Sequence, residues 1–343
     1  MNLLEKFSSL SNESPIGGGG AKRAVSLYSY QEEFFLRKMS LEDCIAAAAA
    51  TGATGIEIVG EQSVPGCPKI PSDAFIDQWF GWMHKYKVRP IAHDMFLDYN
   101  KKKGHYWSDE EAVASFKKDI LFAKALGCKI IRVIVNTTPQ IIEKVLPFAE
   151  ENDIVLGIEV HSPWNINSAW MERHWEVMER TGTQHFGFIP DMGGFTRRLP
   201  RVQVERMIRN GADPEIARYV CEQHEKGVMA EYTIYEVSRM SNKRIDMAVA
   251  ELSRHNTFVN PLSLVPHIDR IVHIHGKCLE MLEDYTEYSI PYKEVIDVLK
   301  KGGYKGYIAT EYEGNRHIQD IYEVDSVEQV RRHQEMLERL ITP

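Results

Sequence analysis

The chain has 343 residues, of which 43% are hydrophobic and 26% are charged, as in an ordinary globular protein. A formal net charge of -8 argues against the basic surface that nucleic-acid binding requires. No apolar run approaches the roughly 20 residues of a membrane helix, and no signal-peptide segment opens the chain. We therefore expect a cytoplasmic protein that binds neither nucleic acid nor membranes.

The five cysteines are scattered, and no two have the spacing of a C-x-x-C motif. Their odd number and irregular spacing predict neither a disulfide framework nor a zinc site built from cysteines. Reduced thiols are typical of a cytosolic protein. The cysteines are Cys44, Cys67, Cys128, Cys221 and Cys278.

Residues 1–23 are polar and include a run of four glycines at 17–20. A phosphate-binding loop would need a strand before this run and a helix after it, and the sequence predicts neither. We therefore expect a flexible N-terminal extension over 1–23, followed by one catalytic domain over 24–343.

From residue 24 onward, short β-branched and apolar runs alternate with amphipathic stretches. Strands are predicted at 24–30, 55–60, 89–96, 129–135, 155–162, 186–194, 271–277 and 306–314. Helices are predicted at 40–51, 72–87, 108–126, 138–151, 168–181, 291–301 and 326–341. Eight such units imply parallel strands joined by right-handed crossovers, which close into a (β/α)8 TIM barrel of the α/β class. A doubly wound open sheet is the structural alternative.

A long connection separates the sixth and seventh predicted strands. It has about 75 residues, far more than a usual loop between strand and helix. Because it is rich in helix formers and charged residues, we predict a helical insertion at about 196–268. The insertion could be a scaffold or oligomer contact, or it could be a lid over the active site.

Ionisable residues lie on one side of the last four strands, near their C-terminal ends. Successive side chains of a strand point to opposite sides, and the helix-facing side of a barrel strand must be apolar. The ionisable side is therefore expected to face the barrel mouth. It carries Glu159, His161, Asp191, His273, His275, Lys277, Glu311 and Glu313.

Three carboxylates and a histidine that converge at one mouth need a cation, because buried like charges repel and are costly to desolvate. The predicted metal ligands are Glu159, Asp191, His275 and Glu311. Carboxylate oxygens with one neutral imidazole suit Mn2+, although Zn2+, Mg2+ and Co2+ remain open. The alternative is that each residue is a solvated loop residue just beyond its strand.

The four ligand candidates stand in the phrases GIEVHS, FIPDMG, HIHGK and TEYEG. This pattern resembles the xylose isomerase-like TIM-barrel superfamily, which includes sugar phosphate isomerases and epimerases. The resemblance implies that Glu159, Asp191, His275 and Glu311 bind the metal. The ketose 3-epimerase branch tends to carry a histidine three residues after the aspartate, where this chain has Gly194, and this departure weakens an epimerase assignment.

The phrases SYQEEFF, MSLEDCIAAAA and GIEVHSP, together with the long insertion before HIHGK, are similar to the alpha subunit of bacterial C-glycoside deglycosidases. This resemblance implies a manganese-type carbon–carbon lyase with a small β-rich partner subunit, acting on glycosides oxidised to a ketone at sugar C3. The alternative is an isomerase or epimerase for a free ketose or sugar phosphate, in which Glu159 and Glu311 move the proton. A non-catalytic barrel is a third alternative.

A C–C glycosidic bond has no leaving oxygen for an acid to protonate, so ordinary glycoside hydrolysis is poorly matched to it. With a metal polarising a C3 ketone, a base can remove the C2 proton and the aglycone can leave by β-elimination. We expect His161 to be this base, because a histidine pKa near 6.5 suits proton transfer at neutral pH. Alternatively, His161 only supports the metal ligands through a hydrogen bond.

Three further residues are candidates for substrate binding. His93 ends the third strand and either contacts sugar hydroxyls or caps the barrel. Lys277 points toward the mouth and is expected to orient a ligand or the enolate. Glu57 ends the second strand and either binds a hydroxyl or forms a salt bridge. His273 lies deeper and is expected to be a core histidine, and Glu313 is expected to lie beyond the metal ligands.

Overall fold

The computed structural model describes residues 20–97, 99 and 103–342. Most of the predicted N-terminal extension, residues 1–19, lies outside the described residues. The first strand already begins at Lys22, so the folded domain starts slightly before the predicted boundary at residue 24. Among the described residues, no helix combines the length and apolarity that crossing a bilayer requires.

Eight parallel strands form one sheet in the order β6-β5-β4-β3-β2-β1-β8-β7. Isolated parallel bridges join Phe188 to Ile271 and Asp191 to His275, so the β6 edge meets the β7 edge and the sheet closes. The predicted TIM barrel is therefore confirmed, and the open sheet is excluded. The strands are β1 (Lys22–Ser26), β2 (Gly55–Val59), β3 (Arg89–Asp94), β4 (Ile130–Val133), β5 (Val155–Val160), β6 (Phe186–Pro190), β7 (Ile274–Cys278) and β8 (Tyr307–Tyr312).

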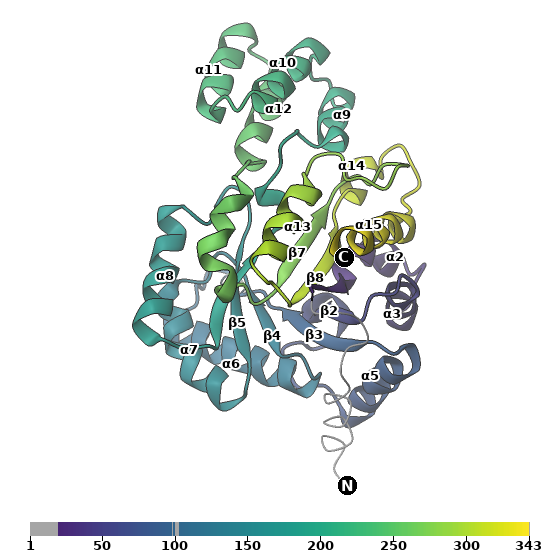
Figure 1. Cartoon of the computed structure of the whole chain (residues 1–343), viewed down its shortest axis with the longest axis vertical. Coiled ribbons are helices and arrows are strands. Elements are labelled where there is room, and N and C mark those ends of the chain that lie inside the picture. The colour runs from purple at the N-terminus through teal and green to yellow at the C-terminus, as the bar shows by residue number, and fades with distance from the viewer. Residues whose placement is uncertain (1–19, 98, 100–102, 343) are drawn as a thin grey trace.

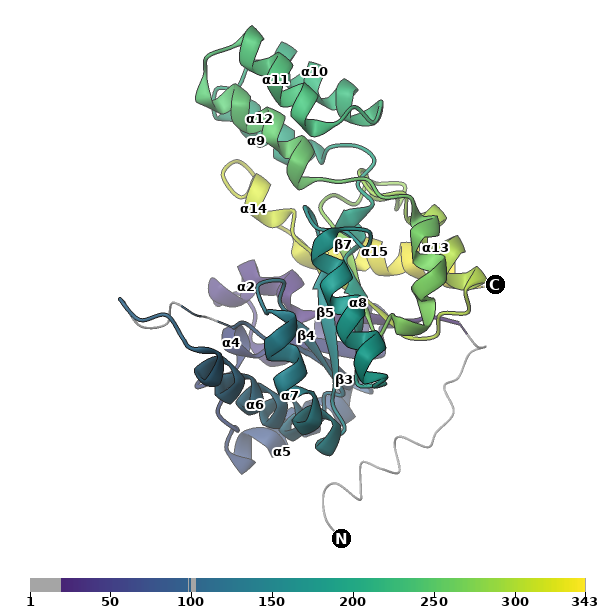
Figure 2. The ribbon, with the colours of Figure 1, turned by 90° about the vertical axis from the view of Figure 1, so that its left-hand side faces the viewer.

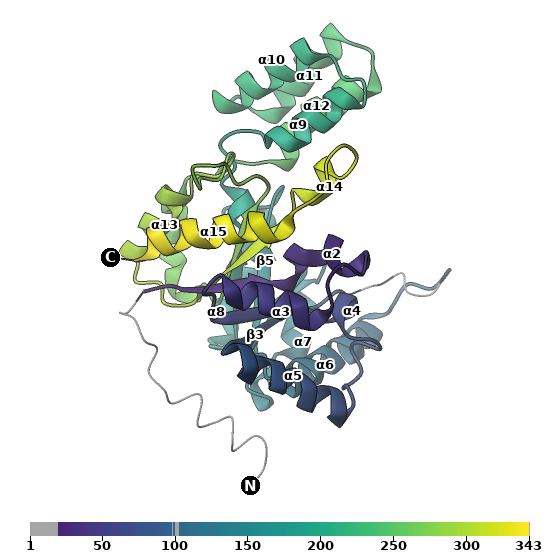
Figure 3. The same cartoon turned by 90° about the vertical axis from the view of Figure 1, so that its right-hand side faces the viewer.

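Helices surround the barrel as an outer layer (Figures 1 and 3). Their starting points follow from the sequence, because a Ser or Thr side chain that accepts a backbone N–H of the first turn stabilises a helix N-terminus. Ser40, Ser72, Ser108, Thr138 and Ser168 cap five of these helices in this way. The layer contains α3 (Leu41–Ala50), α5 (Asp73–Tyr86), α6 (Asp109–Ala125), α7 (Pro139–Glu151), α8 (Ala169–Thr181), α13 (Tyr292–Lys301) and α15 (Ser326–Ile341).

The first strand is shorter than predicted. The chain turns at Leu27 into η2 (Leu27–Tyr30) and α2 (Gln31–Phe35) instead of remaining extended to residue 30. Ser29 holds this turn against β8, because its hydroxyl donates to Thr310 O at 3.0 Å and accepts from Tyr312 N at 3.0 Å. Hydrogen bonding to a distant strand therefore ends β1, and the local apolar pattern does not reveal it.

Four helices occupy the connection between β6 and β7 and extend from one end of the barrel (Figures 1 and 2). They have an apolar core of their own, which includes Val204, Val220, Val237 and Val249. The helices are α9 (Arg201–Arg209), α10 (Pro214–Glu225), α11 (Ala230–Met240) and α12 (Arg244–His255), and η4 (Pro261–Arg270) leads from them to β7. Because they follow the C-terminal end of β6, they lie on the side of the barrel mouth.

The two ends of this helical insertion lie side by side. Thr196 N donates a hydrogen bond to Thr257 O at 2.9 Å. Phe195 and Phe258 form an antiparallel bridge next to it. The chain therefore leaves the barrel and returns to it at one place, close to the end of β6.

The lower part of the barrel interior is packed by small and apolar residues. Ala24, Ala92 and Ala309 are fully buried in one cluster. A Cβ at Gly157 would lie 2.6 Å from Ile189 Cγ1, so only glycine fits on this inner face of β5. This close packing leaves space for polar side chains only toward the C-terminal ends of the strands, as is usual for TIM barrels.

Candidate metal centre

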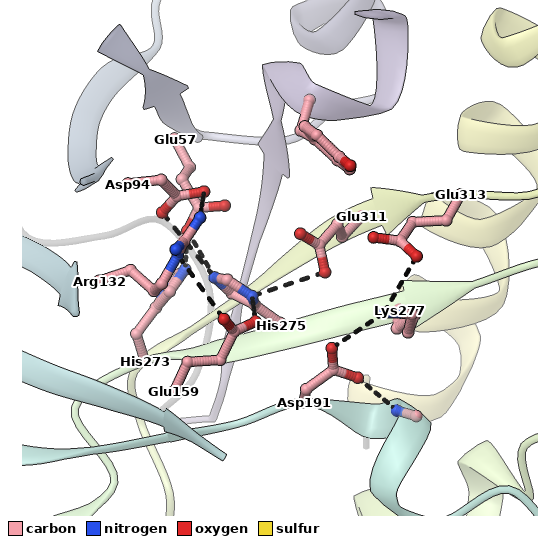
Figure 4. A network of polar contacts seen from close by, with 12 residues as sticks. Glu57, Asp94, Arg132, Glu159, Asp191, His273, His275, Lys277, Glu311 and Glu313 are labelled. Carbon is pink, nitrogen blue, oxygen red and sulfur yellow. Dashed lines mark hydrogen bonds and ion pairs between the residues drawn. The ribbon is translucent and has the colours of Figure 1, made fainter. Parts of the chain in front are cut away.

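Seven of the eight strands direct a charged or histidine side chain inward near their C-terminal ends (Figure 4). All of these side chains are buried. Because the strands are parallel, the side chains meet in one layer just below the barrel mouth. They are Glu57 from β2, Asp94 from β3, Arg132 from β4, Glu159 from β5, Asp191 directly after β6, His275 from β7 and Glu311 from β8.

The four predicted metal ligands are brought together in this layer. Glu159, Asp191, His275 and Glu311 each offer one ligand atom, and these atoms all lie within 4.8 Å of one another. His275 Nδ1 lies 2.8 Å from Glu159 Oε1 and 3.5 Å from Glu311 Oε2. The parallel bridge between Asp191 and His275 sets the position of the fourth residue. They are therefore not separate solvated loop residues.

The donor set fits a divalent cation. Glu311 Oε2 is buried and has no hydrogen-bond partner among the described residues. Burial raises the pKa of Glu311 well above its usual value, although the positive charges of His275 and Lys277 act to lower it. The neighbouring carboxylates of Glu313 and Asp191 raise the pKa further. Three carboxylates and one imidazole, with one carboxylate oxygen buried and not hydrogen-bonded, are the ligands that a divalent cation such as Mn2+ accepts.

Glu57 lies beneath the predicted ligands and is fully buried. Its Oε2 atom is 2.6 Å from His273 Nε2 and 3.3 Å from His275 Nε2. Burial alone would raise the pKa of Glu57, but His275 and His273 outweigh it and hold the pKa well below its usual value. The predicted bond from Glu57 to a substrate hydroxyl stays a prediction, because its other oxygen, Oε1, has no hydrogen-bond partner among the described residues. The salt-bridge alternative fits the structure, and His273 is buried as expected.

The contact with Glu57 also orients the ring of His275. Because Nε2 faces Glu57, Nδ1 faces Glu159 and Glu311. Burial lowers the pKa of His275, but these three carboxylates outweigh it and raise the pKa well above its usual value. A metal-binding histidine usually donates its second ring N–H to a carboxylate or carbonyl, and Glu57 occupies that place.

Asp94 and Arg132 belong to the same layer, and the sequence patterns did not identify them. Arg132 Nη2 lies 3.5 Å from Asp94 Oδ2, and Arg132 Nε lies 3.8 Å from Glu159 Oε2. Burial raises the pKa of Glu159, but Arg132 and His275 outweigh it and lower the pKa. Each is a charged residue within an otherwise apolar strand of a parallel sheet, whose two faces are normally both buried. This pattern could have identified Asp94 and Arg132 as buried charges.

His93 lies on the opposite side of β3 from this layer. The pairing of β2 with β3 shifts at this point, since Ile56 pairs with Pro90 but Glu57 pairs with Ala92. This irregularity turns Asp94 toward the interior and His93 toward α6, where His93 Nε2 lies 3.2 Å from Asp119 Oδ1. The prediction that His93 contacts substrate in the mouth is therefore wrong.

Lys277 extends from β7 toward the mouth and keeps 20% of its side chain exposed. Its Nζ atom lies 3.3 Å from Asp191 Oδ2 and 3.1 Å from Glu313 Oε2. Burial lowers the pKa of Lys277, but Asp191 and Glu313 outweigh it and raise the pKa well above its usual value. A charged ammonium group therefore stands at the rim next to one predicted ligand.

His161 follows β5 and is half-buried. Its Nδ1 atom lies 2.6 Å from the carbonyl oxygen of Ser162, so Nδ1–H is the donor and Nε2 is the basic nitrogen. Ser162 Oγ in turn lies 2.6 Å from Thr257 Oγ1, which ties this turn to the end of the insertion. A Cβ at Gly194, after Asp191, would meet no heavy atom within 4 Å, so open space remains there.

Comparison with known proteins agrees with the fold. The family model described as xylose isomerase-like TIM barrel matches residues 45–340. The 3'-dehydrocarminate deglycosidase alpha subunit of a Microbacterium species is 29% identical over 84% of this chain and 87% of the relative. A C-glycoside deglycosidase alpha subunit of Arthrobacter globiformis is 26% identical over 85% of this chain and 84% of the relative. The solved structure of an L-ribulose 3-epimerase has a TM-score of 0.56 at 12% identity and covers 93% of this chain and 94% of that one.

Proposed function

Since the chain belongs to the xylose isomerase-like TIM-barrel family, we propose that it is the metal-dependent catalytic alpha subunit of a C-glycoside deglycosidase. It would act as a carbon–carbon lyase on C-glycosides that already carry a ketone at sugar C3. The single observation that carries this proposal is the buried layer of Glu159, Asp191, His275 and Glu311, whose ligand atoms lie within 4.8 Å of one another. The names of the two curated relatives supply the substrate class.

The metal proposed for this site is Mn2+. Glu159, Asp191, His275 and Glu311 would hold it, because a set dominated by carboxylate oxygens favours Mn2+ over softer cations. When bound, such a cation supplies Lewis-acid polarisation of a ketone oxygen. Arg132 supports this ligand set from below, since its guanidinium keeps Glu159 ionised.

His161 is the proposed base. It lies two residues beyond Glu159 and just after the same strand, and its hydrogen bond to Ser162 O leaves Nε2 to accept a proton. In this proposal, Nε2 takes the proton from sugar C2. The electron pair of that C–H bond becomes the C1–C2 double bond, and the bond to the aglycone breaks with its pair on the aglycone carbon. That carbon then takes up a proton, so no oxidant or water is consumed.

Lys277 is the proposed substrate-orienting residue. Its charged ammonium group stands at the rim between Asp191 and Glu313, where it can donate a hydrogen bond to a sugar oxygen. Gly194 lies on the same segment as Asp191, and a side chain such as the histidine of the ketose 3-epimerase branch is absent there.

A second chain is part of the proposal. Both curated relatives are named alpha subunits, and this name implies a further subunit for those proteins. We propose that this chain likewise works with a small β-rich partner.

The test incubates the purified chain with Mn2+ and a 3-keto C-glucoside, with and without the candidate partner. Release of the free aglycone only when both chains are present would support the proposal. Epimerisation of free ketoses by this chain alone would overturn it in favour of an isomerase or epimerase. In that alternative, Glu159 and Glu311, which both lie in the central cluster, would transfer the proton.

A further inference from the structure

A second group of side chains of metal-ligating types lies outside the barrel, and the proposed reaction does not use it. Cys67, His93 and Asp119 each offer one ligand atom, and these atoms all lie within 4.8 Å of one another. His93 comes from β3, Asp119 from α6, and Cys67 from the segment that follows α4 (Gly60–Ser63). His93 and Asp119 are 0% and 1% exposed, whereas Cys67 is partly exposed.

Each ring nitrogen of His93 faces an oxygen atom, and in one of the two tautomers this leaves a lone pair aimed at a carboxylate. Nδ1 lies 3.3 Å from the carbonyl oxygen of Ile58, and Nε2 lies 3.2 Å from Asp119 Oδ1. A neutral imidazole has one N–H and one lone pair, so it satisfies only one of these two acceptors. If Nδ1–H donates to Ile58 O, the lone pair of Nε2 faces a carboxylate oxygen. A buried contact of this kind is repulsive unless a proton or a metal ion lies between the two atoms.

The separation of the His93 and Asp119 ligand atoms matches a tetrahedral zinc site. Zinc bonds of about 2.0–2.1 Å at tetrahedral angles place neighbouring nitrogen and oxygen ligands about 3.3 Å apart. The distance from His93 Nε2 to Asp119 Oδ1 is 3.2 Å. The backbone also leaves room for the thiol, because a Cβ at Gly60 would lie 2.8 Å from both Cys67 Sγ and His93 Cε1.

The types of ligand suit a metal ion. Cysteine binds a metal as the thiolate, and with the Asp119 carboxylate it would bring two negative charges, which one divalent cation neutralises. A ligand set that combines sulfur, imidazole and oxygen favours Zn2+ over Mn2+ or Mg2+. The carbonyl oxygen of Ile58 would hold His93 in the tautomer that ligates through Nε2, as second hydrogen bonds of metal-bound histidines usually do.

We propose that Cys67, His93 and Asp119 form a second metal site, which binds Zn2+ and fastens the segment after β2 to α6. The three side chains leave one coordination position, which water can reach from the partly exposed side of Cys67. The site shares no residue with the cluster of Glu159, Asp191, His275 and Glu311. It therefore stands whether or not the chain is a deglycosidase.

The experiment strips the full chain of metal with a chelator and titrates it with Co2+, whose bond to a thiolate gives a charge-transfer band in the near ultraviolet. Metal content after Zn2+ loading is measured in parallel. We expect the wild-type chain to show the thiolate band and to hold one equivalent at each of the two centres. Cys67→Ala should lose the band and one equivalent of zinc. His275→Ala should lose the other equivalent and keep the band.

Two further variants keep the test decisive. Asp119→Asn changes one ligand without removing the thiol, and it should also lose one equivalent of zinc. It therefore provides the test if Cys67→Ala does not fold. Cys221→Ala, in α10, is the matched control and should keep both the band and the metal content. The proposal is overturned if the wild-type chain gives no thiolate band, or if Cys67→Ala holds as much zinc as the wild-type chain.

Discussion

Glu57 and His275 meet inside the barrel, where Glu57 Oε2 lies 3.3 Å from His275 Nε2 on the opposite side of the ring from Glu159. Because this contact sets which nitrogen of His275 faces the predicted ligands, Glu57 would be a positioning residue for the proposed metal centre. We predict that Glu57→Ala weakens Mn2+ binding by about 10–100-fold. Isothermal titration of the metal-free chain with Mn2+ measures this change.

Glu57→Gln is the matched variant for that measurement. Its amide oxygen can still accept a hydrogen bond from one of the two histidines, so we expect a smaller loss of Mn2+ affinity than in Glu57→Ala. Equal affinities in the wild-type chain and Glu57→Ala would contradict the positioning role.

Glu311 and Glu313 lie two residues apart at the C-terminal end of β8, so the effect of each carboxylate on Mn2+ binding can be compared. Glu311 lies 3.5 Å from His275, whereas Glu313 lies 3.1 Å from Lys277 and belongs to the rim. We predict that Glu311→Gln greatly reduces Mn2+ occupancy, because the amide replaces an anionic ligand. Glu313→Gln should keep the metal. Metal analysis of the two purified variants makes the comparison, and equal occupancy in both would argue against Glu311 as a ligand.

His161 should affect turnover without affecting the metal. We predict that His161→Gln lowers kcat for aglycone release by roughly 100–10,000-fold, the usual contribution of a general base. Mn2+ content should stay at the wild-type level, because His161 is outside the four-residue cluster. A variant that retains wild-type kcat, or one that loses its metal, would show that His161 has a different role.

Acid stability should depend on His333. This residue is fully buried, and Thr310 Oγ1 lies 2.7 Å from its Nδ1 atom. Its other ring nitrogen, Nε2, is buried and has no hydrogen-bond partner among the described residues, so a charged ring would leave an N–H unsatisfied there. Burial lowers the pKa of His333 to about 3.

The folded chain therefore binds fewer protons at His333 than the unfolded chain, whose histidine pKa is about 6.5. The stability that depends on the neutral ring is fully present above pH 6.5 and is lost as pH falls toward 3. In this window the free energy of unfolding falls by at most about 1.4 kcal/mol per pH unit. We predict that denaturant unfolding of His333→Gln depends less on pH in this window than unfolding of the wild-type chain. The exposed His84→Gln serves as the control, and an unchanged slope in His333→Gln would contradict the prediction.

The barrel and its helices could be predicted closely because their signals are local. The helices after Ser40, Ser72 and Ser108 begin where a serine precedes an amphipathic stretch. The same holds for the convergence of the four predicted metal ligands. Alternation along a strand places Glu159 and His275 on the inner face without any knowledge of the neighbouring strands.

What could not be predicted depends on contacts between elements. The role of His93 was predicted incorrectly because the shift in pairing between β2 and β3 is a property of two strands together. The depth of Glu57 within the barrel is not visible in its own strand, and only the positions of His273 and His275 reveal it. Cys67 and Asp119 have no motif spacing, and only the folding of three separate segments brings them to His93.

The side-by-side ends of the helical insertion have an evolutionary consequence. Because Thr196 and Thr257 are hydrogen-bonded at its base, the four helices are attached to the barrel as if through a single stem. An appendage attached in this way can diverge, lengthen or be exchanged between relatives while the pairing of β6 with β7 stays intact. Selection could therefore reshape what approaches the mouth without altering the residues that line it.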